Sequence, residues 1–368
     1  MAGIYLHIPF CRQACHYCNF HFSTSLQLKN DFVYALLKEM ELQKNYLAGE
    51  PVSTVYFGGG TPSLLSEKEL STLLQALRLQ FYILPDAECT LEANPDDINP
   101  VKLAAWKQAG INRLSIGVQS FYEEDLRWMN RAHSADQAVN CIKAAQDAGI
   151  TNLTIDLIYG APTLPDDHWR HNVQTAIDLH IPHLSCYALT VEPGTALNAF
   201  IKKNQVRDIN TDDQARQFLL LMDWMQQAGY EHYEISNFAL PGMRSKHNSA
   251  YWQGATYLGL GPSAHSFNGR ERQWNISNNA LYIKSVNEGL VPFEKEVLTD
   301  TQRLNEYIMT SLRTVEGLDL DYVQRAFNTT VHANKFIKEG KLKEEGSRLV
   351  LTREGKLFAD GIAADLFV

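Results

Sequence analysis

The chain has 368 residues, of which 45% are hydrophobic and 20% are charged, with 33 basic and 42 acidic side chains. This length allows one large domain and a smaller one, and the net charge of −9 argues against general nucleic-acid binding, which needs a basic face. No apolar run reaches the roughly 18 residues of a membrane span, and the start of the chain lacks the features of a signal peptide, so we expect a cytoplasmic protein.

Six strand-like runs alternate with amphipathic helical stretches in the first half of the chain. The apolar, β-branched runs cover Gly3–Ile8, Thr54–Gly58, Glu88–Glu92, Arg113–Val118, Leu153–Ile158 and His183–Leu189. The helical stretches between them cover Asp31–Tyr46, Glu67–Leu77, Val101–Ala109, Ala135–Ala148 and Asp167–Leu179. Successive βα units predict a parallel sheet with helices outside it. The pattern alone leaves an open doubly wound sheet and a full or partial barrel as alternatives.

The chain becomes more irregular after the sixth run. A helix near Asp212–Gln227 and a strand at Tyr230–Ile235 are followed by a stretch rich in glycine, asparagine and aromatic residues, Asn237–Asn279. From about Thr299 the pattern is helical and ends in a strand pair, around Lys343–Glu345 and Arg348–Leu351. We therefore expect a core over residues 1–235, an extension of it over 236–298 and a C-terminal helical domain over 299–368.

The six cysteines fall into two groups. Cys11, Cys15 and Cys18 lie close together after the first strand, and three single cysteines are expected to be core residues: Cys89, Cys141 and Cys186. Three thiolates in one loop suit a [4Fe–4S] cluster that leaves one iron open for a non-protein ligand. A zinc site completed by His16 or His21 is the alternative. The loop is expected at the carboxyl end of its strand, where βα folds place their chemistry.

Polar residues also mark the ends of the next strands. The run Gly58–Pro62, with the sequence GGGTP, follows the second strand, and its glycines would allow the backbone to approach a ligand closely. Glu92 ends the third strand, Gln119 ends the fourth with Arg131 beyond it, and Asp156 lies in the fifth. Singly, each could be a salt-bridged structural residue, because a lone carboxylate in an apolar strand is costly. Together they suit one cationic, ribose-bearing ligand.

The CxxxCxxC spacing after a first strand, with an aromatic residue before the third cysteine, resembles the radical S-adenosylmethionine (SAM) superfamily. Five further motifs resemble its oxygen-independent coproporphyrinogen III oxidase group over nearly the whole chain: Tyr5-x-His7-Ile8-Pro9-Phe10-Cys11, GGGTP, Glu-x-Asn-Pro, Gly-Val-Gln-Ser and Asp-Leu-Ile-Tyr-Gly. The resemblance implies a partial (β/α)6 barrel, of the TIM-like kind, with a smaller C-terminal helical, winged-helix-like domain. It also implies cluster or SAM contacts by Tyr5, Cys11, Cys15, Tyr17, Cys18, Gly59, Gly60, Thr61, Glu92, Gln119, Arg131 and Asp156.

Two departures from that group favour its heme chaperone branch, the HemW-like proteins. Oxidases of the group carry a fourth cysteine where this chain has Phe20, and a longer segment before the first strand, where only four residues precede Tyr5. The motif HNxxYW at residues 247–252 resembles the heme-contact signature of the branch. His247 is its candidate iron ligand, and Tyr251 and Trp252 offer flat apolar area to a porphyrin. A buried histidine in an aromatic core is the alternative interpretation.

This resemblance implies a protein that binds heme and delivers it to acceptor proteins, membrane-bound acceptors among them, and it leaves a homodimer open. The alternative function is an enzyme that decarboxylates coproporphyrinogen III by radical chemistry. Phe20, the short N-terminus and the HNxxYW motif all favour the chaperone. The C-terminal module carries 10 basic and 11 acidic residues from Asp300 onward, a net charge of −1. We expect a lid or docking surface there rather than a DNA-binding module.

Overall fold

The centre of the protein is a parallel sheet of six strands. In the computed structural model, which describes residues 1–368, these strands are neighbours in chain order within a sheet of twelve: β12-β11-β10-β9-β1-β2-β3-β4-β5-β6-β8-β7. The six strands are β1 (Ala2–Ile8), β2 (Val52–Gly59), β3 (Ile83–Ala93), β4 (Arg113–Gln119), β5 (Leu153–Tyr159) and β6 (His183–Ala188). All six predicted strands are confirmed. Their long apolar runs reflect burial on both faces, as expected for parallel strands.

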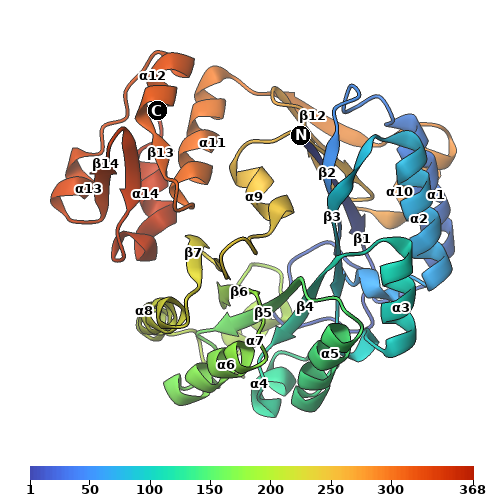
Figure 1. Ribbon diagram of the computed structural model, residues 1–368, viewed down its shortest axis with the longest axis horizontal. Helices are drawn as coiled ribbons and strands as arrows, with labels where there is room; N and C mark the ends of the chain where they lie inside the picture. The colour runs from blue at the N-terminus through green and yellow to red at the C-terminus, as the bar shows by residue number, and fades with distance from the viewer.

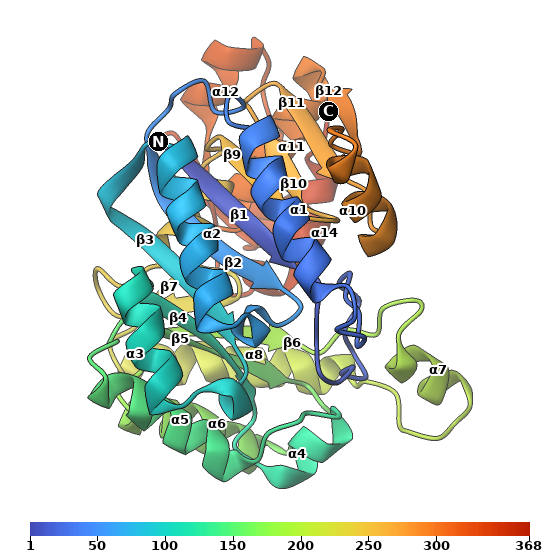
Figure 2. The ribbon, with the colours of Figure 1, turned by 90° about the vertical axis from the view of Figure 1, so that its right-hand side faces the viewer.

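Helices cover the outer face of this sheet. They are α1 (Lys29–Leu42), α2 (Glu67–Gln80), α3 (Pro100–Ala109), α5 (Ala135–Asp147), α6 (Asp166–Asp178) and α8 (Thr211–Gln227). Two short helices lie in the connections that follow β4 and β6, α4 (Glu123–Trp128) and α7 (Ala196–Lys202). In Figure 1 the sheet and its helices form an arc that does not close, and Figure 2 shows α1 and α2 lying across β1 and β2 and α7 projecting away from the sheet. The fold is therefore the expected partial barrel, open on one side.

The segment after β6 extends both edges of the sheet. β9 (Tyr257–Leu260) pairs in parallel with β1, and β10 (His265–Phe267), β11 (Glu271–Asn275) and β12 (Phe293–Val297) continue that edge in antiparallel fashion. At the other edge, β8 (Asn237–Ala239) pairs with β6, and β7 (Glu231–Glu234) pairs with β8. The stretch 237–279, for which the sequence predicts no strands, thus contains four of them. They are short and carry polar residues, so their pattern does not resemble that of a strand.

Buried polar contacts tie this edge to the first helix. The Glu39 carboxylate on α1 accepts hydrogen bonds from the Tyr282 hydroxyl, the Gly261 amide and the Asn275 side chain. Tyr282 belongs to α10 (Asn279–Asn287), which packs beside α1. Because all of these groups are buried, the carboxylate supplies the acceptors that the edge strands need.

One short helix, α9 (Lys246–Trp252), lies inside the curve of the barrel and packs on β2. The Ser245 side chain caps its first turn. The Glu88 carboxylate on β3 accepts the amide protons of Lys246 at 3.2 Å and of His247 at 3.0 Å. A negative group at a helix N-terminus is favourable, so Glu88 fixes α9 against the inner face of the sheet.

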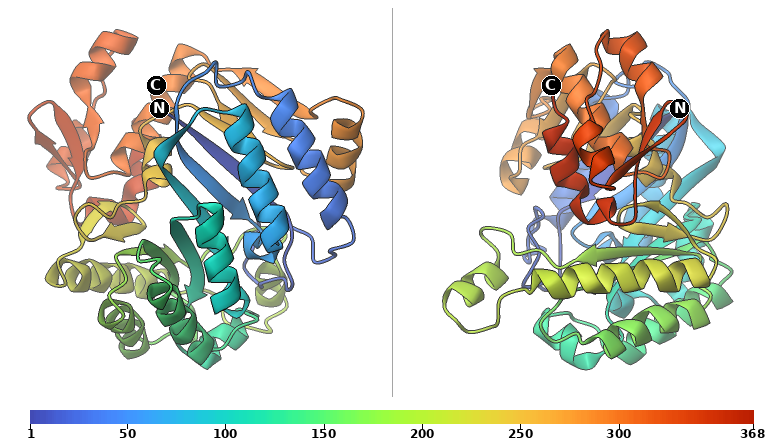
Figure 3. Two further views of the ribbon diagram at one scale, coloured as in Figure 1. Left: turned by 45° about the vertical axis from the view of Figure 1, so that its right-hand side comes forward. Right: turned by 90° about the vertical axis from the view of Figure 1, so that its left-hand side faces the viewer.

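The C-terminal region has a hydrophobic core of its own, formed by residues between Leu304 and Leu366. Its helices are α11 (Asp300–Leu312), α12 (Leu320–Phe327), α13 (Asn334–Lys338) and α14 (Ala359–Asp365), and its sheet has the order β13-β15-β14 (Leu318–Asp319, Arg348–Leu351, Leu342–Glu345). The predicted strand pair is confirmed. Figure 3 shows this region beside α8 and β7, far from α1 to α3. No helix in the protein combines the length and the hydropathy that crossing a membrane requires.

Candidate functional site

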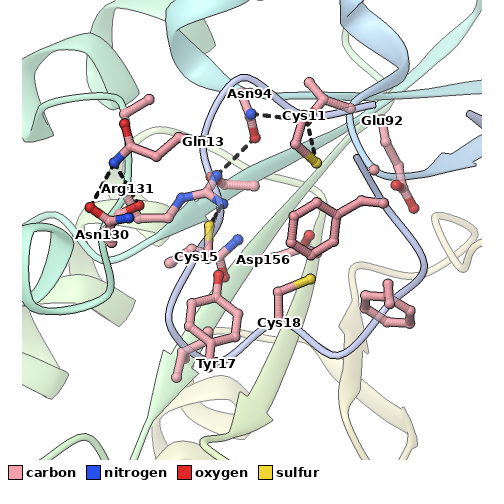
Figure 4. Close-up of a pocket in the computed structure, with 18 of the residues that line it drawn as sticks. Cys11, Gln13, Cys15, Tyr17, Cys18, Glu92, Asn94, Asn130, Arg131 and Asp156 are labelled. Atoms are coloured by element: carbon pink, nitrogen blue, oxygen red, sulfur yellow. Dashed lines mark hydrogen bonds between the residues drawn. The ribbon is translucent and has the colours of Figure 1, made fainter. Parts of the chain in front are cut away.

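A cavity of about 460 Å³ lies at the carboxyl ends of the central strands. Figure 4 shows its side chains gathering from the loop after β1 and from β3, β5 and the chain after β4. The lining includes nearly all of the predicted cluster and SAM residues: Cys11, Cys15, Tyr17, Cys18, Gly59, Gly60, Thr61, Glu92, Gln119, Arg131 and Asp156. Tyr5 lies just outside it, next to Glu92, since both side chains are about 3 Å from a Cβ placed on Gly58. Residues far apart in sequence therefore share one site.

The cysteine loop is held in place by hydrogen bonds from its neighbours. The Thr61 hydroxyl donates to Cys11 Sγ at 3.4 Å, and the Arg131 guanidinium donates to Cys15 Sγ at 3.2 Å. The Gln13 side-chain amide donates to the carbonyl and side-chain oxygens of Asn130, both at 2.9 Å. Burial raises the pKa of the Cys11 thiol to about 11. Such a thiol becomes a thiolate when a cationic metal centre compensates its charge.

The two histidines of the zinc alternative point elsewhere. His16 Nδ1 is 2.8 Å from the carbonyl oxygen of Trp128, and His21 Nε2 is 2.7 Å from Asn279 Oδ1. Neither histidine lines the cavity. The donor set at the cavity is thus three thiols without an imidazole, which fits a [4Fe–4S] cluster with one open iron better than a tetrahedral zinc ion.

The guanidinium of Arg131 crosses the floor of the site. It donates at 2.8 Å to Asn94 Oδ1 and at 2.8 Å to the carbonyl oxygen of Gly117, and its Nε is buried without a partner. Asn94 in turn donates to the Thr61 hydroxyl at 3.4 Å. The sequence interpretation did not include Asn94 among the site residues. Its position two residues after Glu92, in the Glu-x-Asn-Pro motif, was the available signal.

Two half-buried carboxyl groups, Glu92 and Asp156, face the cavity. Glu92 accepts a hydrogen bond from the Tyr56 hydroxyl at 2.8 Å and one from the Gly59 amide at 3.2 Å. Burial raises the pKa of Glu92 to about 8, with the nearby charge of Asp156 adding to the effect. Burial also raises the pKa of Asp156 to about 7, against the opposing influence of Arg131. Such carboxyl groups gain most from a cationic ligand, which favours their ionised form.

The glycines of the GGGTP run are required by packing as well as by the cavity. Gly59 has φ +108°, and a Cβ there would lie 2.6 Å from His7 Nδ1. A Cβ on Gly60 would lie 2.7 Å from the carbonyl oxygen of Phe10. The glycines therefore allow the backbone of this run to lie close to the end of β1, in addition to the close approach to a ligand that the sequence suggests. Gln119 has φ +69°, a conformation strained for a side-chain-bearing residue and often found at functional sites.

The HNxxYW motif lies on α9, beneath the cavity. His247 is buried, with Nδ1 2.8 Å from the Thr54 hydroxyl and Nε2 2.9 Å from the Tyr251 hydroxyl. Its ring stacks on Tyr56 at 4.9 Å between centroids. Burial lowers the pKa of His247 to about 3, so the ring is neutral. Trp252 packs under the guanidinium of Arg313, 5.2 Å from the ring centre. The motif and the cavity are thus linked through Tyr56, which contacts both His247 and Glu92.

Comparisons with known proteins agree with this geometry. Residues 5–176 match the family model described as the radical SAM superfamily, and residues 298–358 match the HemN C-terminal domain. Heme chaperone HemW of Mycobacterium tuberculosis is 36% identical over 99% of this chain and 94% of its own length, and that of Bacillus subtilis is 32% identical over 98% of each. The solved structure of coproporphyrinogen III oxidase HemN from Escherichia coli, described as a radical SAM enzyme, matches this chain with a TM-score of 0.85 at 24% sequence identity. The match covers 100% of this chain and 90% of that one, and it shows the fold. The chain belongs to the HemW family of the radical SAM superfamily.

Proposed function

We propose that this protein is a heme chaperone that binds heme and delivers it to acceptor proteins. The observation that carries the proposal is the similarity to heme chaperones named HemW over nearly the full length of both chains. The complete set of thiols and strand-end polar groups around one cavity supports the radical SAM part of the assignment.

In this proposal Cys11, Cys15 and Cys18 would hold a [4Fe–4S] cluster with one iron left open for SAM. When bound and reduced, such a cluster would supply the electron for cleavage of SAM. Glu92 and Asp156 would bind the ammonium group and ribose hydroxyls, and Arg131 the carboxylate. The remaining SAM contacts would come from Tyr5, Tyr17, Gly59, Gly60, Thr61 and Gln119. Asn94 is added as a positioning residue, since it orients the Arg131 guanidinium.

Heme is proposed to bind at His247, Tyr251 and Trp252. Both nitrogens of His247 are hydrogen-bonded in the structure. For Nε2 to bind iron, it must give up its contact with the Tyr251 hydroxyl, so heme binding would turn the Tyr251 side chain away from His247.

The alternative function, coproporphyrinogen III decarboxylation, has weaker support. Phe20, where the oxidase group has a fourth cysteine, is 68% exposed at the mouth of the cavity. The likeness to the oxidase HemN is one of fold, at 24% identity. The proposal further includes a cytoplasmic location, acceptors that include membrane proteins, and a homodimer, but no nucleic acid.

The test is an anaerobic comparison of the two functions in one preparation of reconstituted protein. We expect saturable heme binding near one equivalent, and no decarboxylation of coproporphyrinogen III in the presence of SAM and a reductant. Turnover of coproporphyrinogen III without saturable heme binding would contradict the proposal. The Cys11→Ala variant is the control, since it should lose any SAM-dependent chemistry.

A further inference from the structure

A second cavity lies between the barrel and the C-terminal domain. It has a volume of about 470 Å³, within the range of small-molecule sites. One wall comes from α8 and the β7 region, including Met222 and His232, and the other from the C-terminal domain, including Lys343, Arg353 and Lys356. None of these residues takes part in the site proposed for the cluster, SAM or heme.

The central polar contact in this cavity joins the two domains. The Lys356 ammonium group donates to His232 Nδ1 at 2.9 Å. His232 Nε2 is 3.0 Å from the carbonyl oxygen of Ile235, so this nitrogen carries the ring proton and Nδ1 is the acceptor. The ring stacks on Phe238 at 4.2 Å, which fixes its orientation. His232 is therefore a neutral acceptor and does not compensate the charge of Lys356.

The other basic residues of the cavity have carboxylate partners. Arg313 pairs with Glu234 at 2.9 Å and with Asp360 at 2.8 Å. Arg353 pairs with Asp223 at 2.6 Å. Lys343 pairs with Glu345 at 2.5 Å, but both side chains are more than half exposed.

Lys356 makes no ion pair, although it is partly buried. Burial lowers the pKa of Lys356 to about 8; the charge of Glu234 opposes this change, while Lys343 and Arg353 add to it. The Glu234 charge is itself matched by Arg313. Lys356 is thus the one cation of the cavity that no carboxylate pairs with directly.

We propose that this cavity binds a small oxyanion, a phosphate or a carboxylate group, through Lys356. The ammonium group uses one proton for His232 and has two left for such a ligand. A charge-assisted hydrogen bond to an oxyanion is among the stronger polar contacts in proteins. Lys343 can turn toward the same ligand, because its exposed ion pair with Glu345 is weak. The ligand would bridge the two domains.

The pH dependence of binding follows from the charges around the ligand. Lys356 must be protonated to bind an anion, so affinity should fall as the pH rises through about 8. The other charged groups around Lys356 are Lys343, Arg353, Arg313, Glu345 and Glu234. His232 stays neutral, since burial lowers its pKa to about 3.

The test uses calorimetry on the full-length holoprotein with two probes, inorganic phosphate and succinate, at constant ionic strength set with chloride. We expect saturable binding of at least one probe, with the stronger one identifying the ligand class. Lys356→Met should weaken binding at least tenfold, or about 1.4 kcal/mol. Lys335→Met is the matched control, because it removes one positive charge from the same domain, outside the cavity, and should leave binding unchanged.

Two further measurements keep the test independent of folding defects. Lys356→Arg retains the charge and should retain binding, and wild-type affinity should fall on passing from about pH 7 to about pH 9. Binding of neither probe to the wild type, equal binding by Lys356→Met, or an affinity independent of pH in this window would overturn the proposal.

Discussion

The contact between Tyr56 and Glu92 yields a sharp prediction for the Tyr56→Phe variant. The Tyr56 hydroxyl is one of two protein donors to the Glu92 carboxylate, the other being the Gly59 amide. A hydrogen bond to a charged group contributes about 1.5–3 kcal/mol. Its loss should therefore raise the pKa of Glu92 by about one unit or more above its value of about 8.

The consequence for SAM follows from the protonation of Glu92. If cationic SAM needs the ionised carboxylate, a rise of one unit in the pKa of Glu92 lowers affinity about tenfold near neutral pH. At about pH 9.5, where the carboxyl group ionises in the variant as well, most of the loss should disappear. Equilibrium binding of SAM to the reconstituted protein at both pH values measures this directly.

Tyr34→Phe provides the control, since it removes an exposed hydroxyl from α1 and should bind SAM as the wild type does. The reasoning is refuted if Tyr56→Phe binds SAM with unchanged affinity. It is also refuted if the loss is equal at both pH values, because that would indicate a packing defect.

Three further outcomes are expected. Replacing Cys11, Cys15 or Cys18 by Ala should abolish loading of iron and sulfide, and full loading would exclude a cluster at this loop. Cys141→Ala should load normally, because that thiol is a core residue. Without SAM, the free energy of unfolding should fall as the pH rises from about 5 to about 8. The raised pKa values of Glu92 and Asp156 mean that the folded state holds more protons in this window. Urea titrations at several pH values should show a smaller fall of the unfolding free energy with pH for Glu92→Gln than for the wild type. An equal fall in both proteins would contradict this account. Glu39→Ala should lower the free energy of unfolding by at least about 3 kcal/mol, since three buried donors lose their acceptor at about 1–3 kcal/mol each. The exposed Glu41→Ala is its control, and equal urea midpoints for the two variants would refute the role of Glu39.

The central strands and the cavity could be predicted because they leave local signals. Parallel strands buried on both faces give unbroken apolar runs, and polar residues at their ends stand out against them. Glu92 and Asp156 are identified in this way, and the three cysteines are identified by their close spacing in one loop. The edge strands β8 to β12 give no such signal, since their conformation depends on pairing with β1 and β6 rather than on their own pattern.

Contacts across long sequence separations could not be predicted from single runs. Tyr56 lies in an apolar strand and resembles a core residue, yet its hydroxyl reaches Glu92 and its ring reaches His247. That arrangement depends on α9 lying inside the barrel, which follows from the Glu88 contact at its N-terminus. The pairing of His232 with Lys356 likewise depends on how the two domains pack.

The central claim, heme binding at the HNxxYW motif, is tested most directly by heme titration of the wild type and His247→Ala, followed by the Soret absorption band. Removing an imidazole ligand changes the coordination of the iron and hence the spectrum. We expect a shifted band and weaker binding, with some binding retained because apolar contacts to the porphyrin faces remain. An unchanged spectrum and affinity in His247→Ala would contradict the account.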